Sequence, residues 1–207
     1  LSIKNLNNLK FDYPTSITEQ EKIGNYFSNL DTVINNKQRQ LELMEKYKED
    51  LLDKIFNQKI RFKDENGCDY PEWNPYKITE ILKTVSNKKH SRDFDILSVT
   101  KDNGIVKRSD NGINIKASEK SIFQYKIVEI NDYILHLESF RNGIDKSYIK
   151  GVCSPVYTIL REKTENILLP ILFKYSGFIH RINQLSTGIR QGKNISFSSM
   201  ENLKINL

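Results

Sequence analysis

The feature that most constrains this chain is a 3.5-residue repeat of apolar side chains between residues 18 and 57. Along it, positions advance by alternating steps of four and three residues, and two lysines, Lys37 and Lys48, share the series with eight apolar residues: Ile23, Phe27, Leu30, Ile34, Leu41, Met44, Leu51 and Ile55. This spacing is typical of the seam of a coiled coil. Because the segment contains no proline, we predict one continuous helix over residues 18–57, about 60 Å long.

Such a helix needs a partner, because a stripe of this length cannot be buried on a small domain alone. The chain contains no second helix pattern of similar length. Two capping boxes, Ser16 with Glu19 and Thr18 with Glu21, give two alternative starts of the helix that differ by about two residues. The seam lysines have two interpretations: their ammonium groups extend out of an ordinary seam, or they fix its register at some cost in stability.

Charge and cysteine content narrow the class of protein. The chain has 207 residues, is 38% hydrophobic and 28% charged, and has no apolar run near the roughly 20 residues of a membrane span. Its net charge of +6 is uneven, since residues 58–207 hold 24 Lys and Arg against 17 Asp and Glu. A basic folded part suggests a polyanion partner, with simple solubility as the alternative. Cys68 and Cys153 have no metal-site spacing and predict reduced thiols in a cytoplasmic protein.

The part after the helix predicts a mixed α+β domain. Asn66-Gly67 marks a turn in the linker that leads into it, and Trp73 is expected to pack at its entrance. Short strands are expected at 94–100, on both sides of Asn131-Asp132 within 126–137, and in a strand–turn–strand over 147–160. Helices are expected at 78–85 and at 167–182. The fold class is thus α+β, a long coiled-coil helix followed by a globular mixed-sheet domain.

The two ends of the chain resemble each other. Residues 1–11 align without gaps on residues 195–205, with identical Ser, Asn, Leu and Lys. The chain therefore spans slightly more than one period of a larger repeat, in which residues 1–17 end a preceding domain and a second long helix would follow. This predicts either a fragment or a natural half-subunit.

Several short motifs resemble one known family. The helix and the residues before it carry Tyr13-Pro14, Glu19-Gln20-x-Lys22-Ile23, Leu30-Asp31 and Leu51-Leu52-x-Lys54-Ile55-Phe56, and the linker carries Ile60-Arg61-Phe62 and Pro71-Glu72-Trp73. Later segments of the same kind are 151–157 and 186–203. Together they resemble the DNA specificity subunit of type I restriction–modification enzymes. The resemblance covers the whole chain but is weak across residues 77–125.

The resemblance implies an organisation and a set of partners. Residues 18–57 would be the conserved spacer and dimerisation helix, and residues 58–207 a target-recognition domain that binds double-stranded DNA. The subunit would be non-catalytic and would scaffold methyltransferase subunits and, through the complex, the restriction and translocase subunit. This chain would bind no cofactor, since S-adenosylmethionine, ATP and Mg²⁺ would belong to the partner subunits. Two copies would pair through antiparallel helices.

The sequence motifs that resemble catalytic motifs are all incomplete, so no catalytic or metal site is predicted. Asn74-Pro75-Tyr76 lacks the second proline of an adenine-methyltransferase motif, and Gly188-x-x-x-Gly192-Lys193-Asn194 is a shortened phosphate loop without its Ser or Thr. The three histidines have no ligand spacing. Two rival functions stay open: a coiled-coil adaptor whose domain binds protein, and a fused methyltransferase–nuclease, against which the missing Gly-rich cofactor loop argues.

The predicted DNA contacts are clusters of cationic and amide side chains. Lysines supply phosphate contacts, whereas Arg, Asn and Gln are candidates to read bases. The densest cluster is the glycine-containing loop over residues 186–194. The candidates are Lys88, Lys89, Arg92, Lys107, Arg108, Arg141, Asn142, Thr187, Arg190, Gln191, Lys193 and Asn194.

Overall fold

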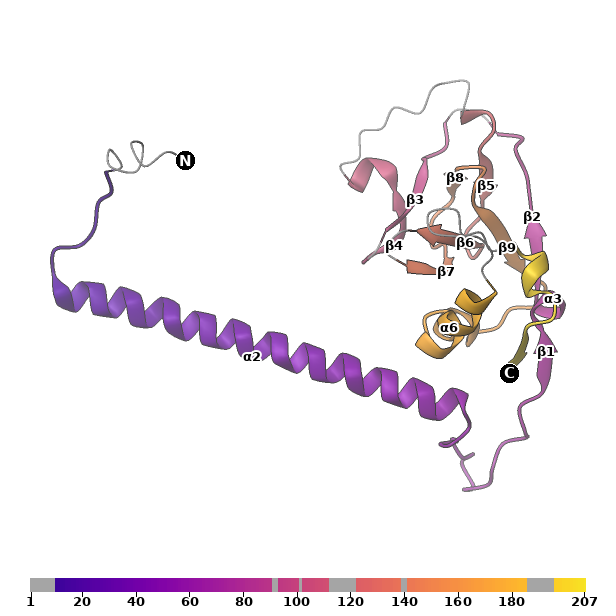
Figure 1. Ribbon diagram of the computed structural model, residues 1–207, viewed down its shortest axis with the longest axis horizontal. Helices are drawn as coiled ribbons and strands as arrows, with labels where there is room; N and C mark the ends of the chain where they lie inside the picture. The colour runs from indigo at the N-terminus through magenta and orange to yellow at the C-terminus, as the bar shows by residue number, and fades with distance from the viewer. Residues whose placement is uncertain (1–9, 91–92, 101, 112–121, 139–140, 186–195) are drawn as a thin grey trace. The chain divides into compact units, whose positions relative to one another are not determined.

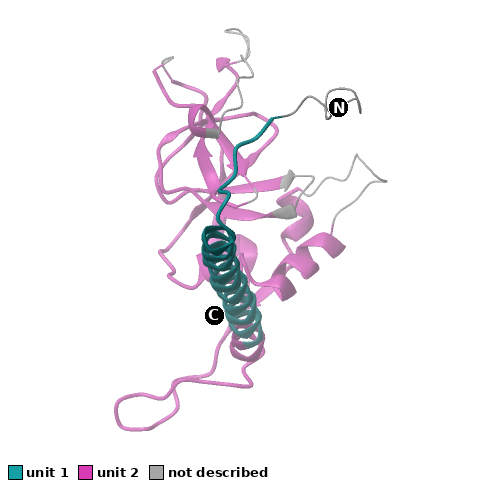
Figure 2. Cartoon of the chain, turned by 90° about the vertical axis from the view of Figure 1, so that its left-hand side faces the viewer, with its two compact units in different colours: residues 1–50 teal, residues 51–207 magenta. Residues whose placement is uncertain are grey.

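The computed structural model describes residues 10–90, 93–100, 102–111, 122–138, 141–185 and 196–207 (Figure 1). The chain divides into two compact units, Leu1–Asp50 and Leu51–Leu207, shown in separate colours in Figure 2. No helix in the described ranges is long and apolar enough to cross a membrane.

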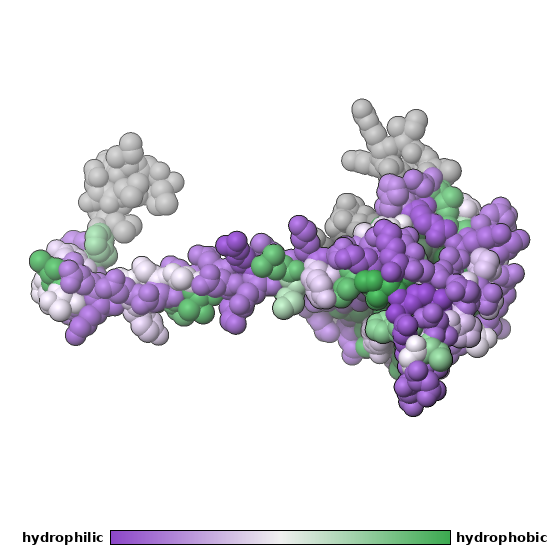
Figure 3. Space-filling view, turned by 90° about the horizontal axis from the view of Figure 1, so that it is seen from below, coloured by the Kyte–Doolittle hydropathy of each residue, from purple (hydrophilic) through white to green (hydrophobic). Residues whose placement is uncertain are grey.

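The first unit is dominated by α2, Ile17–Phe56, a helix of 40 residues that confirms the long helix predicted from the apolar repeat. Of the two possible caps, Ser16 is the one used: its Oγ accepts a hydrogen bond from the Glu19 amide at 3.5 Å. No residue of α2 is buried. Six of the eight apolar side chains of the seam are exposed, from 43% for Ile23 to 69% for Met44, and Leu51 and Ile55 are half-buried. Figure 3 shows green hydrophobic groups recurring along the helix.

The last turn of α2 belongs to the second unit and packs there on aromatic rings. The Phe56 ring stacks on Tyr175 with centroids 5.2 Å apart, and it meets Trp73 edge-on at 6.2 Å. The Tyr175 hydroxyl donates a hydrogen bond to Asp53 Oδ1 at 2.8 Å. Trp73 therefore lies at the entrance to the unit, as the sequence predicted. In the linker, the predicted Asn66-Gly67 turn is present, with Gly67 at a φ of +79°.

The second unit contains a four-stranded antiparallel sheet in the order β2-β9-β6-β7. Its strands are β2 Leu82–Val85, β9 Thr158–Glu162, β6 Tyr133–Glu138 and β7 Arg141–Lys146. Three two-stranded ladders accompany it. These are β1 Pro75–Lys77 with β10 Lys204–Asn206, β3 Leu97–Thr100 with β4 Gly104–Lys107, and β5 Lys126–Val128 with β8 Gly151–Cys153.

Both faces of the four-stranded sheet are covered because apolar side chains occupy successive positions on β6 and β9. On one face, Tyr133 and Leu160 join a core with the helices α3 Ile78–Ile81, α5 Leu169–Leu172 and α6 Ser176–Gln184. On the other face, Ile134 and Ile159 pack with residues of β3, β5 and β8. Short 3-10 turns, η1 Arg108–Asn111 and η3 Ser198–Met200, complete the unit. These elements confirm the mixed α+β class.

Two of the predicted helices are wrong in extent. The helix expected at 78–85 ends at Ile81, because the next four residues form β2 and pair with β9. The helix expected at 167–182 is broken between α5 and α6, where Tyr175 adopts an extended conformation with φ −70° and ψ 127°. That break turns the Tyr175 ring onto Phe56. Packing between distant segments overrides local helical propensity at both places.

Candidate nucleic-acid interface

The first predicted cluster lies on the loop that follows β2. Lys88 and Lys89 are both exposed, and Arg92 lies outside the described residues. The loop is held against β5 and the segment before it, because Lys88 Nζ donates to Gln124 Oε1 at 3.2 Å and the Ile127 amide donates to the Asn87 carbonyl at 2.8 Å. The two ammonium groups are therefore carried on an anchored loop and remain open to solvent.

Lys107 and Arg108, at the end of β4, are engaged within the unit. Lys107 Nζ lies 2.8 Å from Asp95 Oδ2, and this hydrogen bond raises the pKa of Lys107. Arg108 Nε donates to Ser98 Oγ at 3.2 Å. A phosphate that recruits Lys107 would have to compete with Asp95 for the ammonium group. Spacing along the chain could not show this, because the acid comes from a separate segment before β3.

The remaining candidates fall at the edges of the described chain. Arg141 and Asn142 open β7, where they pair with Glu138 and Leu137 of β6, and their side chains lie outside what the structure describes. Thr187, Arg190, Gln191, Lys193 and Asn194 also lie outside the described residues. Their segment follows α6, and α6 lies beside β7. The fold thus places α6, the element before that segment, beside the strand of Arg141.

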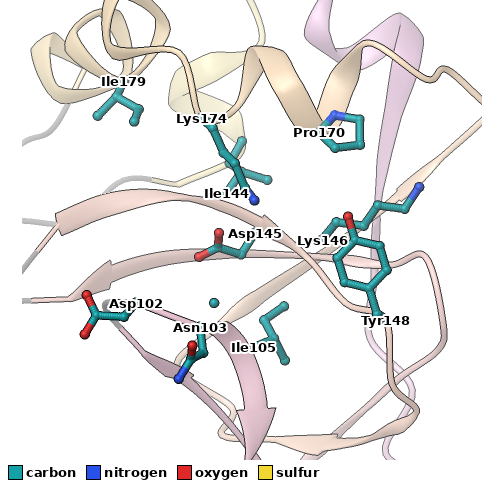
Figure 4. A pocket seen from close by; sticks show the side chains of 11 residues that line it. Asp102, Asn103, Ile105, Ile144, Asp145, Lys146, Tyr148, Pro170, Lys174 and Ile179 are labelled. Atoms are coloured by element: carbon teal, nitrogen blue, oxygen red, sulfur yellow. The ribbon is translucent and has the colours of Figure 1, made fainter. Parts of the chain in front are cut away.

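A cavity of about 390 Å³ lies between the β3–β4 turn, β7 and the helices α5 and α6 (Figure 4). The turn contains the Asn103-Gly104 pair, with Gly104 at a φ of +63°, a conformation that favours glycine. The lining carries both charges, with carboxylates from Asp102 and Asp145 and ammonium groups from Lys146 and Lys174. No group of side chains suited to a metal ion occurs in the described part of the chain.

One wall of this cavity includes Asp145, which forms a buried side-chain contact that the sequence did not reveal. His136 Nε2 lies 2.8 Å from Asp145 Oδ2, and the two side chains are 0% and 4% exposed. The pair joins β6 to β7, which are adjacent strands, and the bond fixes how the hairpin packs. Asp145 is nine residues from His136 in the sequence, and the pairing of β6 with β7 brings the two together.

Two further cations hold the fold together. Arg161 donates from Nε and Nη2 to the two carboxylate oxygens of Asp132, at 2.6 and 2.8 Å, and this pairing raises the pKa of Arg161. Lys126 Nζ donates to the carbonyls of Pro155 and Tyr157 at 2.8 and 2.7 Å, and burial lowers its pKa. Part of the positive charge of residues 58–207 is therefore used internally.

Comparison with known proteins adds no relative. No protein-family model matches the sequence, and a search of the curated proteins finds no significant match.

Proposed function

We propose that this chain is a DNA-recognition subunit of a type I restriction–modification system. Residues 58–207 read one half of a bipartite target in double-stranded DNA, and the long helix joins this domain to a second one and scaffolds the methyltransferase subunits. The observation that carries the proposal is the pairing of a basic α+β unit with a 40-residue helix whose heptad seam is exposed.

The exposed seam supports a joining role for α2. Between Ile23 and Met44, six apolar seam residues are each at least 43% exposed, and none is buried by the described residues. Burying a side chain of this kind stabilises an assembly by about 1.5–3 kcal/mol. A partner helix packed along the seam would bury several of these side chains and gain this free energy for each. The distance between two reading domains would then depend on how the helices pair.

The charge of the second unit supports DNA as the ligand. Lys88 and Lys89 supply exposed ammonium groups for phosphates, and the candidate base readers are the Arg, Asn and Gln residues of β7 and of the segment after α6. The chain itself performs no chemistry in this proposal. S-adenosylmethionine, ATP and Mg²⁺ act on the partner subunits, and the assembly works in the cytoplasm.

The proposal is tested by selecting target DNA. The full chain, purified with the subunits that accompany it in its own cells, is mixed with random double-stranded DNA, and the bound fraction is sequenced. We expect a bipartite motif with two short defined halves and a fixed undefined spacer. Methylation mapping of the host genome should show the same motif. Sequencing that returns no enriched motif, together with no matching methylation, would rule the proposal out.

The adaptor alternative uses the helix in the same way but gives the domain a protein partner. It is favoured by the internal engagement of Lys107 and Arg108, two of the predicted DNA contacts. Salt separates the two functions, because DNA binding through phosphates weakens steeply as salt rises, whereas an apolar protein interface does not.

A further inference from the structure

The cavity beside β7 has a buried floor and an exposed rim (Figure 4). The floor is formed by Ile144 and Asp145, which are 1% and 3% exposed. The rim carries three side chains that are open to solvent, Asp102, Tyr148 and Lys174. The volume of about 390 Å³ lies in the range of small-ligand sites, which is about 300–1,000 Å³. A small molecule can therefore enter from solvent and reach buried groups.

Charges of both signs face this cavity. In Figure 4 the Lys174 side chain extends from the segment between α5 and α6 toward β7, which carries the Asp145 carboxylate. Asp102 adds a second carboxylate from the β3–β4 turn. Among the described residues, neither Lys174 nor Asp102 has an ion-pair partner. Lys146 is directed elsewhere, since its Nζ lies 5.7 Å from the centroid of the Tyr133 ring. Lys174 is thus the ammonium group available to a ligand.

The fold holds the Asp145 carboxylate toward the β3–β4 turn. Its Oδ2 lies 2.8 Å from His136 Nε2, and its Oδ1 is the atom nearest to a Cβ built on Gly104, at 3.8 Å. Because Gly104 has no side chain, this residue leaves the space in front of Oδ1 open. A carboxylate has several acceptor positions, so Asp145 can accept a hydrogen bond from a ligand while it keeps its contact with His136.

The remaining walls of the cavity are apolar. They are formed by three half-buried side chains, Ile105 of β4, Pro170 of α5 and Ile179 of α6. Walls of this kind favour a ligand with an apolar body, because the ligand then covers them from water. The charges at the floor and the rim add a second requirement. A ligand with one sign of charge would leave a charge of the cavity unmatched, whereas a ligand with both signs would satisfy both.

We propose that this cavity binds a free amino acid with a large apolar side chain. The carboxylate of the ligand accepts hydrogen bonds from the Lys174 ammonium group, and the ammonium group of the ligand donates to the carboxylates of Asp102 and Asp145. The side chain of the ligand lies against the three apolar walls. The site goes beyond the proposed function, because none of the residues that line it is among the predicted DNA contacts.

Calorimetric titration of the full chain with L-phenylalanine tests the site, alongside two analogues that each lack one charge. Phenethylamine lacks the carboxylate, and hydrocinnamate lacks the ammonium group. We expect L-phenylalanine to bind and each analogue to bind roughly tenfold or more weakly, because hydrogen bonds to one charged group are lost. No measurable binding of L-phenylalanine would overturn the proposal. An analogue that binds as tightly as L-phenylalanine would also overturn it, because the cavity would then recognise a single charge.

Two variants locate the binding site on the chain. Lys174→Met keeps the length of the side chain but removes its charge, and it should weaken L-phenylalanine roughly tenfold or more without weakening phenethylamine. Asp102→Asn should weaken both of these compounds, because both carry the ammonium group, without weakening hydrocinnamate. Lys83→Met is the matched control, at an exposed position of β2 outside the cavity, and should bind L-phenylalanine as the unmodified chain does.

Both substituted residues of the cavity are exposed, so the fold should tolerate each change, and circular dichroism checks that it does. The opposite responses of phenethylamine and hydrocinnamate separate loss of one contact from loss of the whole site. If Lys174→Met and Asp102→Asn bind L-phenylalanine as tightly as Lys83→Met, the amino acid binds elsewhere and the proposal is wrong.

Discussion

At the scale of single residues, the Asp132–Arg161 pair shows how a buried charge is stabilised. Asp132 is 1% exposed, and its Oδ2 also accepts a hydrogen bond from the Glu129 amide at 2.8 Å. Arg161 reaches it through two hydrogen bonds while 39% of its own side chain stays exposed. The guanidinium therefore neutralises a carboxylate that water cannot solvate.

Replacing Arg161 with Met should destabilise the second unit by about 2 kcal/mol, because it leaves a buried carboxylate without its counter-charge. Lys150→Met is the matched control. Lys150 Nζ lies 3.0 Å from Glu129 Oε1, but both side chains of this pair are more than 40% exposed. Its loss should cost less than about 0.5 kcal/mol. Urea unfolding measures both variants, and equal midpoints would contradict the assigned role of Asp132.

The two cysteines should differ sharply in reactivity. Cys153 is buried on β8, and burial raises its pKa from 9.0 to about 12, whereas Cys68 is exposed. Iodoacetamide should alkylate Cys68 in the native protein and Cys153 only after unfolding, as intact mass will show. Rapid labelling of Cys153 under native conditions would contradict its burial.

The same shift predicts a pH dependence of stability. The unfolded chain ionises this thiol near pH 9.0 and the folded chain near pH 12. The contribution of the buried, neutral Cys153 thiol to the free energy of unfolding is therefore complete below pH 9.0, and it is lost as pH rises toward 12. Cys153→Ala should flatten the fall in the urea midpoint over this window, relative to the unmodified chain.

At the scale of elements, glycine matters most where β8 passes the segment before β3. A Cβ built on Gly151 would lie 2.5 Å from the Asp95 carbonyl oxygen and 2.7 Å from Leu97 Cγ. The Val152 amide donates to that same carbonyl at 2.9 Å, so the two backbones cannot separate freely. This contact explains a glycine in an otherwise apolar strand.

Gly151→Ala should therefore destabilise the second unit by about 1–3 kcal/mol, measured by urea unfolding. Gly24 offers the opposite case, since nothing lies within 4 Å of a Cβ built there on α2. Gly24→Ala should stabilise the helix by about 0.5–1 kcal/mol and raise its melting temperature in circular dichroism. A neutral Gly151→Ala would mean that β8 can move away from Asp95.

Elements that depend on interactions between residues close in the sequence could be predicted, whereas the pairing of strands with distant segments could not. The period of α2 is local, so its bounds were found within about one residue. The strands on both sides of Asn131 were also found, but β5 pairs with β8 and β6 with β7 and β9. The expected strand–turn–strand at 147–160 likewise splits its strands between two sheets. Local pattern indicates a strand, whereas its partner depends on packing across the whole unit.

The candidate site shows the same limit. Clusters of cations are visible in the sequence, but their internal partners are not: Asp95 for Lys107 and Ser98 for Arg108 become neighbours only through the β3–β4 ladder. Pairing of β1 with β10, which come from opposite ends of the second unit, was equally invisible. Of the predicted contacts, Lys88 and Lys89 are described and exposed.

At the scale of the whole molecule, the proposed function requires that α2 bring two units together. Leu41→Asp places a carboxylate in the centre of the exposed seam and should split the assembly into monomers. Glu42→Gln, on the neighbouring outer position, should leave it unchanged. Light scattering measures the mass of both, and a stable monomer for the unmodified chain would contradict pairing through the seam.

Salt dependence of DNA binding gives the sharpest test of the second unit's role. The logarithm of the affinity for the selected target should fall linearly with the logarithm of salt concentration, with a slope set by the number of phosphates contacted. Replacing Lys88 and Lys89 with Gln should reduce that slope by about one to two and weaken binding to all sequences alike, because lysine ammonium groups contact phosphates. Replacing Lys46, an exposed lysine of α2 in the first unit, should leave the slope unchanged. Fluorescence anisotropy at several salt concentrations measures all three proteins. If the double variant keeps the full slope, the loop after β2 lies off the DNA, and the contacts must come from β7 and the segment after α6.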